Sequence, residues 1–110
     1  METIDDDAVF QTQVIKAPKG QPVLVSFMAT WCGPWRAIKP KLDELEASYK
    51  NRVTFVAVDV DGAEQTAASV DINSLPTFMM FIDGKEQKGT FSGANSDKLV
   101  SELLKPYALG

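Results

Sequence analysis

Hydrophobic residues along the chain fall into short continuous runs separated by segments with helical periodicity. Residues 23–29, 53–60 and 78–82 are mostly apolar, and each run is bounded by polar or turn-forming residues. Short runs of this kind are typical of strands that are covered on both faces of a sheet. The pattern therefore predicts three buried strands.

Helical periodicity marks the segments around these runs. After residue 34, apolar residues recur at intervals of four, three and four, at Ile38, Leu42, Leu45 and Tyr49. This spacing places them on one stripe of a helix. Three aspartates at positions 5–7 suit the positive end of a helix dipole. The sequence predicts helices over residues 5–16, 34–49, 63–70 and from 95 or 96 to about 107.

The order of these elements predicts an α/β layered fold. Strand–helix–strand units form right-handed crossovers and therefore parallel pairs. Asp83-Gly84 predicts a hairpin into a further strand over residues 86–91, which adds antiparallel pairing. We expect one domain over residues 1–110, with a mixed central sheet and helices on both faces. The pattern leaves open whether residues 1–4 add an edge strand.

The amino-acid composition excludes several kinds of catalytic and metal-binding site. The chain has 110 residues, a net charge of −4, no histidine and a single cysteine, Cys32. These facts exclude Ser-His and Cys-His catalysis, histidine-ligated metal and an internal disulfide, so we expect no metal and no cofactor. The acidic balance argues against a nucleic-acid or membrane surface. No secretory signal and no apolar run of about 20 residues is visible, which predicts a soluble, cytoplasmic protein.

The candidate reactive group is the thiol of Cys32, which lies between a predicted strand and a predicted helix. A thiol just before a helix meets unpaired backbone N–H groups and the positive end of the dipole, and both favour the thiolate. Gly33 leaves the sulfur uncrowded, Pro34 starts the helix, and Arg36 adds positive charge nearby. The segment predicts an exposed nucleophilic cysteine, the alternative being an inert buried thiol.

Four motifs, in order along almost the whole chain, resemble the thioredoxin family. Trp31-Cys32-Gly33-Pro34 is similar to the first four residues of that family's Trp-Cys-Gly-Pro-Cys motif. The others are Leu75-Pro76-Thr77-Phe78, which resembles its cis-proline segment, Asp83-Gly84-Lys85, which resembles its hairpin, and Ser92-Gly93-Ala94, which resembles its last glycine turn.

The resemblance implies a set of roles. Cys32 would be the attacking thiol, and Pro76 would follow a cis peptide bond. A shallow apolar patch would hold a substrate polypeptide and would be formed by Trp31, Gly33, Pro34, Leu75, Pro76, Thr77 and Gly93. The implied partners are protein disulfides, with a thioredoxin reductase or glutathione. The chain would be a monomer that forms a Cys32-linked dimer on oxidation.

Three positions depart from the family pattern. Trp35 stands where the resolving cysteine is expected, Ser26 where a buried aspartate is usual, and Ala57 where an acid–base partner is frequent. Without a second thiol, Cys32 would form a mixed disulfide that only an external thiol releases. Two placements of Trp35 are open: an indole buried at a packing cost, or one turned outward beside Trp31.

A function of a different class is also open. The apolar patch of Trp31, Pro76 and Gly93 would serve a non-catalytic protein-binding module, in which Cys32 is incidental. A glutaredoxin-like use of glutathione is the weaker alternative, because the sequence has no evident basic cluster for a glutathione carboxylate.

Overall fold

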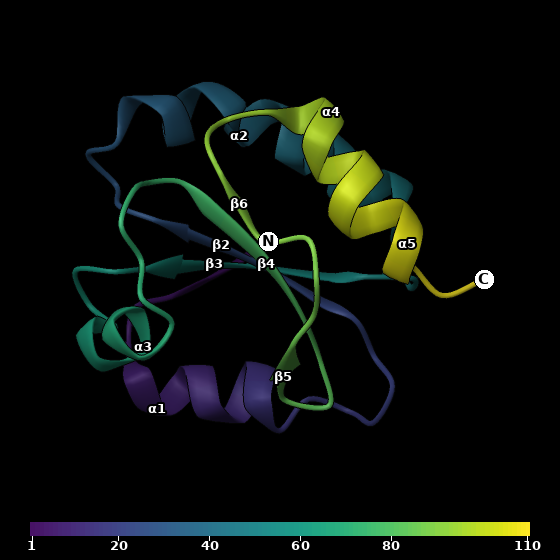
Figure 1. Cartoon of the computed structure of the whole chain (residues 1–110), viewed down its shortest axis with the longest axis horizontal. Helices are drawn as coiled ribbons and strands as arrows, with labels where there is room; N and C mark the ends of the chain where they lie inside the picture. Colours follow the sequence, from purple (N-terminus) through teal and green to yellow (C-terminus); the bar gives the residue numbers. More distant parts are fainter.

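The computed structural model describes all 110 residues and places a six-stranded mixed sheet between two layers of helices (Figure 1). The path through the sheet is β1-β3-β2-β4-β5, and β6 pairs with β4 beside it. This arrangement confirms the predicted α/β fold with a mixed central sheet and helices on both faces.

The three predicted buried strands are present as β2 (Val23–Met28), β3 (Thr54–Asp59) and β4 (Thr77–Ile82). β2 pairs in parallel with β3, as the crossover argument requires, and antiparallel with β4. Residues at the start of the chain form an edge strand, β1 (Glu2–Ile4), parallel to β3. The first four residues therefore do add an edge strand to the sheet.

The predicted continuous strand over residues 86–91 is wrong. The structure has two short strands instead, β5 (Lys85–Glu86) and β6 (Phe91–Ser92), each antiparallel to β4. Between them Gly89 has a φ of +116°, and a Cβ at this position would lie 2.7 Å from the carbonyl oxygen of Glu102. The backbone therefore leaves the sheet to pass close over the C-terminal helix, which interrupts the ladder.

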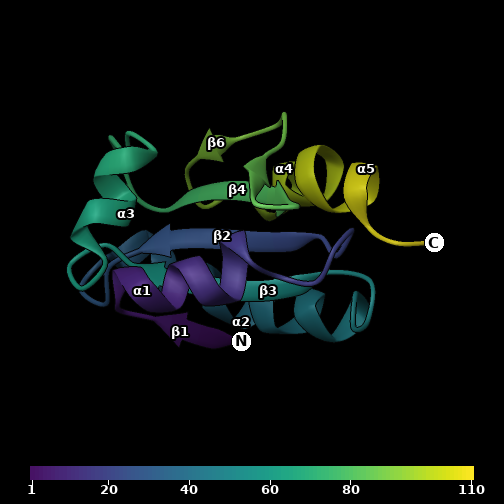
Figure 2. The same ribbon diagram turned by 90° about the horizontal axis from the view of Figure 1, so that it is seen from below.

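Each face of the sheet is covered by its own pair of helices (Figure 1 and Figure 2). One face carries α1 (Asp7–Phe10), which continues as the π-helical segment η1 (Gln11–Ile15), and α3 (Glu64–Ser69). The other face carries α2 (Gly33–Ser48) and the C-terminal helix. The latter consists of α4 (Ser96–Leu99), η2 (Val100–Leu104) and α5 (Lys105–Tyr107).

The alternation of side chains along the strands divides the core into two clusters. Val23, Val25 and Phe27 belong to the cluster on the α1 and α3 side. Leu24 and Met28 belong to the larger cluster on the α2 and α4 side. Because residues two apart on a strand share a face, Ser26 lies on the α2 side as well.

Candidate functional site

The site lies where β2 ends and α2 begins. After Met28 the chain makes a turn in which the N–H of Cys32 donates to the carbonyl of Ala29 over 3.0 Å. Cys32 is the N-cap residue of α2, and Pro34 lies in its first turn. Proline suits this turn because the first N–H groups of a helix have no partner within it. The predicted strand-to-helix placement of the thiol is confirmed.

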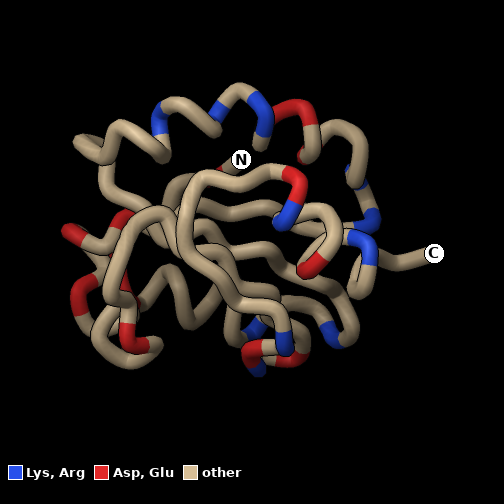
Figure 3. Tube along the Cα trace, turned by 45° about the horizontal axis from the view of Figure 1, so that its top comes forward, with Lys and Arg blue, Asp and Glu red and all other residues tan.

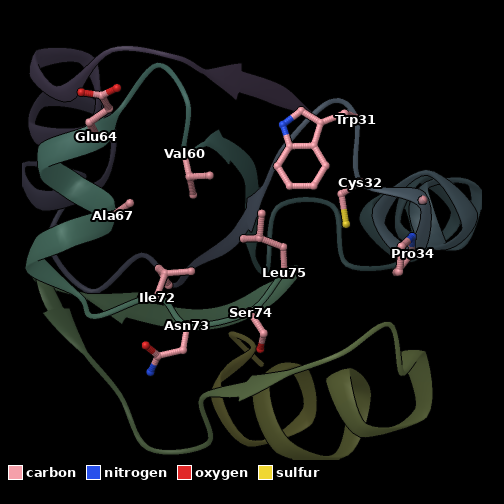
Figure 4. Close-up of a pocket in the computed structure, with 11 residues that line it drawn as sticks. Trp31, Cys32, Pro34, Val60, Glu64, Ala67, Ile72, Asn73, Ser74 and Leu75 are labelled. Atoms are coloured by element: carbon pink, nitrogen blue, oxygen red, sulfur yellow. The ribbon is translucent and has the colours of Figure 1, made fainter.

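The predicted exposure of Cys32 is wrong. The residue is only 5% exposed and belongs to the core cluster that contains Met28, Ala29 and Trp35. The turn back to Ala29 directs Cys32 against these side chains, and the local sequence does not reveal this packing. The residue nevertheless borders an open cleft, and its sulfur is drawn on the cleft wall in Figure 4.

This cleft has a volume of about 750 Å³ and is called the Cys32 cleft below. Most of its lining is apolar, and α2, α3 and the segment before β4 supply its walls (Figure 4). The lining residues are Trp31, Cys32, Gly33, Pro34, Val60, Glu64, Ala67, Ile72, Asn73, Ser74 and Leu75. A concave, mostly apolar cleft with a thiol in its wall suits an apolar segment of a ligand.

Trp31 forms an exposed wall of the cleft. It is 66% exposed, and its indole Nε1 donates a 2.8 Å hydrogen bond to Oδ2 of Asp61. The backbone N–H of Asp61 in turn donates to Oδ1 of Asp59 over 2.9 Å. These two bonds connect Trp31 to the end of β3, so the orientation of the ring depends on the neighbouring strand as well as on its own loop.

The structure separates the predicted binding residues into two groups. Trp31, Gly33, Pro34 and Leu75 line the Cys32 cleft with Cys32 itself. The other group lies outside this lining and consists of Pro76, Thr77 and Gly93. Arg36, predicted to add charge near the sulfur, is exposed on α2 and does not line the cleft.

Hydrogen bonds hold the residues of the second group in place. The Leu75–Pro76 peptide bond is cis, as predicted, and the carbonyl of Pro76 accepts a hydrogen bond of 2.9 Å from the N–H of Gly93. Thr77 is buried, and its hydroxyl donates to the carbonyl of Ser74 over 2.6 Å. The Thr77 side chain thus braces the loop from within.

Sequence reasoning missed the α3 side of the cleft. Val60 follows β3, Glu64 and Ala67 belong to α3, and Ile72 lies in the connection to β4. The predicted parallel pairing could have located this side of the cleft, because the parallel strands β2 and β3 end at the same edge of the sheet. Side chains that follow β3 therefore lie opposite those that follow β2.

Trp35 takes the buried of its two possible placements. It is 5% exposed and packs in the core cluster with Met28, Ala57 and Phe78. It does not line the Cys32 cleft. The position three residues after the thiol is therefore filled by an apolar ring that faces the core.

Ser26 lies on the same side of the sheet and has no hydrogen-bond partner. It is fully buried, and its hydroxyl Oγ bonds to no other group in the structure. Its neighbours across the strands are Ala57 on β3 and Phe78 on β4. A buried hydroxyl without a partner is destabilising, because it loses its hydrogen bonds to water without replacing them.

Charge is divided unevenly around the site. Figure 3 shows a group of acidic residues without basic ones around α3 and the end of β3, whereas basic and acidic residues are mixed along α2 and elsewhere on the surface. Residues 53–84 contain no lysine or arginine. Their acidic residues are Asp59, Asp61, Glu64, Asp71 and Asp83.

One carboxyl group next to α3 has a shifted pKa. The pKa of Asp7 is lowered chiefly because its carboxylate accepts a hydrogen bond from the Thr66 hydroxyl, and further because it accepts one from the Thr66 backbone N–H. These bonds are 2.7 Å and 2.8 Å long and connect α1 with α3. The helix that forms one wall of the cleft is thus held by a charged group on its far side.

No cluster of three or more metal-binding side chains is present, and no helix has the length and apolar character that crossing a bilayer requires. The cleft itself presents one thiol, an indole, the carboxylate of Glu64 and a largely apolar surface.

Comparison with known proteins agrees with this geometry. A family model described as Thioredoxin matches residues 2–105. Thioredoxin from Pongo abelii is 38% identical over 107 residues, a match that covers 94% of this chain and 99% of that protein. Human thioredoxin is 39% identical over 107 residues with the same coverage.

Solved structures give the same result. Fasciola hepatica thioredoxin superimposes with a TM-score of 0.87 at 38% identity, covering 97% of this chain and 99% of that one. The thioredoxin NaTrxh from Nicotiana alata superimposes with a TM-score of 0.88 at 28% identity, covering 98% of this chain and 92% of that one.

Proposed function

Because the chain belongs to the thioredoxin family of thiol–disulfide oxidoreductases, we propose that Cys32 attacks protein disulfides and that the reaction stops at the mixed disulfide. One observation carries this proposal: Cys32 is the only cysteine, and the residue three positions after it, where the resemblance places the second thiol, is the buried Trp35. The chain therefore captures its substrate and does not release it unaided.

The proposed step is a single exchange of sulfur bonds. The Cys32 thiolate attacks one sulfur of a substrate disulfide, a new S–S bond forms between the two proteins, and the other substrate sulfur leaves as a thiolate. The position of Cys32 at the N-terminus of α2 supports this role, because it places the residue on the wall of an open cleft that a substrate segment can enter.

Release of the substrate requires a thiol from outside the chain. In a dithiol protein the second cysteine attacks the mixed disulfide, but here Trp35 is apolar and directed into the core. A small thiol such as glutathione, or the cysteines of a thioredoxin reductase, would supply the missing nucleophile. We propose that the protein works in the cytoplasm, where a lone thiol stays reduced and such thiols are available.

Burial of Cys32 favours a second candidate function. With a 5% exposed thiol and a cleft lined mainly by apolar groups, the chain is also suited to bind a polypeptide without covalent chemistry. Trp31 would then be the contact residue, since exposed tryptophan is a frequent anchor in interfaces. In this case the cysteine contributes packing alone.

Adduct formation distinguishes the two functions. The reduced protein is mixed with a protein disulfide such as insulin and analysed by non-reducing electrophoresis and mass spectrometry. We expect a covalent adduct that is reversed by dithiothreitol and absent from Cys32→Ser. Oxidation of the protein alone should give a Cys32-linked dimer.

Reaction with iodoacetamide measures whether reagents can reach the Cys32 thiol in the folded protein. If native Cys32 is alkylated only after unfolding, and no adduct forms, single-thiol capture is refuted. Substrate binding that is unchanged in Cys32→Ser would then support the binding module.

A further inference from the structure

The Cys32 cleft contains a single charged residue, Glu64. Every other lining residue is apolar, polar and neutral, or the cysteine itself. Glu64 lies on α3 at the opposite end of the cleft from Cys32 and Pro34, with Val60 and Leu75 between them (Figure 4). A ligand that extends away from the sulfur along the apolar floor therefore arrives at a carboxylate.

No group in the protein neutralises this carboxylate. Glu64 is exposed, takes part in none of the three salt bridges and makes no side-chain hydrogen bond. An acid in the first turn of a helix is favoured by the helix dipole, which accounts for a glutamate on α3. The dipole does not account for its position on the wall of a cleft that also holds the thiol.

The surroundings of Glu64 add to its negative potential. Asp59 and Asp61 lie at the end of β3, just before α3, and no lysine or arginine occurs between residues 53 and 84. Charges of one sign beside a low-dielectric wall attract ligands of the opposite sign. The α3 end of the cleft is therefore suited to a cation.

We propose, resting on the function proposed above, that the Cys32 cleft selects polypeptide segments in which apolar residues separate a lysine or arginine from the reactive cysteine. The apolar part of the segment lies over Val60, Ile72 and Leu75, and the cationic side chain pairs with Glu64. Charge complementarity identifies this occupant, because an acidic segment would meet repulsion from Glu64 with no basic residue in the cleft to offset it.

Non-covalent binding tests the preference separately from the thiol chemistry. Peptides are made with a central serine in place of cysteine, apolar neighbours, and one lysine, glutamine or glutamate at successive positions on either side. Dissociation constants are measured on Cys32→Ser by NMR titration of the Trp31 indole N–H. Glu64→Gln and Glu64→Lys are compared in the same background.

The matched control is Glu102→Gln. Glu102 is an exposed glutamate on η2, on the opposite face of the sheet from α3. Its replacement by glutamine changes the net charge by the same amount as Glu64→Gln but leaves the lining of the cleft unchanged. We expect the best lysine peptide to bind roughly two- to fivefold more tightly than its glutamine counterpart, as is usual for partly exposed ion pairs. The preference should persist in Glu102→Gln, vanish in Glu64→Gln, reverse in Glu64→Lys and weaken at high salt.

Equal affinity for lysine and glutamate peptides, no measurable binding of any peptide, or a lysine preference that persists in Glu64→Gln would each overturn the proposal. The function proposed above is tested separately with the corresponding disulfide peptides and the unmodified chain. Loss of all adducts with an intact lysine preference would refute the covalent chemistry alone. Adducts that form equally fast with lysine and glutamate peptides would refute the charge selection alone.

Discussion

The indole of Trp31 and the carboxylate of Asp61 are joined by a hydrogen bond of 2.8 Å, although they are 30 residues apart in the sequence. Trp31 follows β2 and Asp61 follows β3, and these two strands are parallel neighbours. The bond therefore spans the edge of the sheet at the mouth of the Cys32 cleft. It holds an exposed aromatic ring against a surface that would otherwise leave it free to rotate.

Asp61→Ala tests the role of this bond in substrate capture. We expect slower adduct formation at Cys32, because a mobile indole contributes less to binding, and a loss of stability of about 0.5–1.5 kcal/mol, as is typical for one hydrogen bond. Rates are measured by quenched mass spectrometry and stability by urea denaturation. Asp61→Asn is the control, since its amide oxygen still accepts the bond. A rate in Asp61→Ala equal to that of the unmodified chain would contradict this role.

Trp35→Cys tests whether the missing thiol limits turnover. We expect this variant to catalyse insulin reduction with dithiothreitol, where the unmodified chain forms adducts without sustained turnover, because the second thiol resolves the mixed disulfide. The new cysteine also leaves a cavity in the core, and we expect destabilisation of about 3–5 kcal/mol, the range for truncation of a large buried ring.

Trp35→Ser is the matched control for this experiment. It creates a similar cavity without a thiol, so a change in activity caused by loosened packing alone would occur in both variants. Strong turnover by the unmodified chain would show that release of the mixed disulfide does not require a cysteine at position 35.

Ser26→Ala should stabilise the protein or leave its stability unchanged. The Ser26 hydroxyl is fully buried and unpartnered, so removing it relieves a desolvation cost of about 1–3 kcal/mol, offset by the small volume lost. Ser26→Asp should be strongly destabilising, because it buries a carboxylate beside Ala57 and Phe78. Thermal and urea unfolding measure both. Clear destabilisation by Ser26→Ala would mean that the hydroxyl has a partner, such as a buried water.

Asp7 should make stability dependent on pH. Its ordinary pKa of 3.8 is lowered in the folded protein, chiefly by the hydrogen bond from the Thr66 hydroxyl. A lowered folded pKa means that the charged carboxylate stabilises the fold above about pH 3.8, and that this contribution is lost as the pH falls through the lowered pKa.

Asp7→Asn provides the measurement. We expect it to be less stable than the unmodified chain at neutral pH, with the difference in unfolding free energy shrinking as the pH falls into the acid range. Thr66→Val, which removes the hydroxyl donor, should reduce the same pH dependence. A difference between Asp7→Asn and the unmodified chain that stays constant with pH would show that the charge of Asp7 does not contribute.

The sequence alone determined the layered fold and the location of the thiol. Strands β2, β3 and β4 could be predicted because buried strands in an α/β sheet are continuously apolar, a property of the residues themselves. Cys32 and Pro34 could be assigned to the start of a helix because proline and the apolar spacing after it mark such a start. The family motifs identified the cis bond before Pro76, which the structure contains.

Tertiary structure decided what the local pattern does not encode. The burial of Cys32, the inward placement of Trp35 and the unpartnered hydroxyl of Ser26 depend on side chains that arrive from other elements. Glu64 joined the site only because β2 and β3 are parallel and end at one edge. A periodic pattern reports which residues share a face, whereas a cleft depends on which faces meet, and only the packed chain determines that.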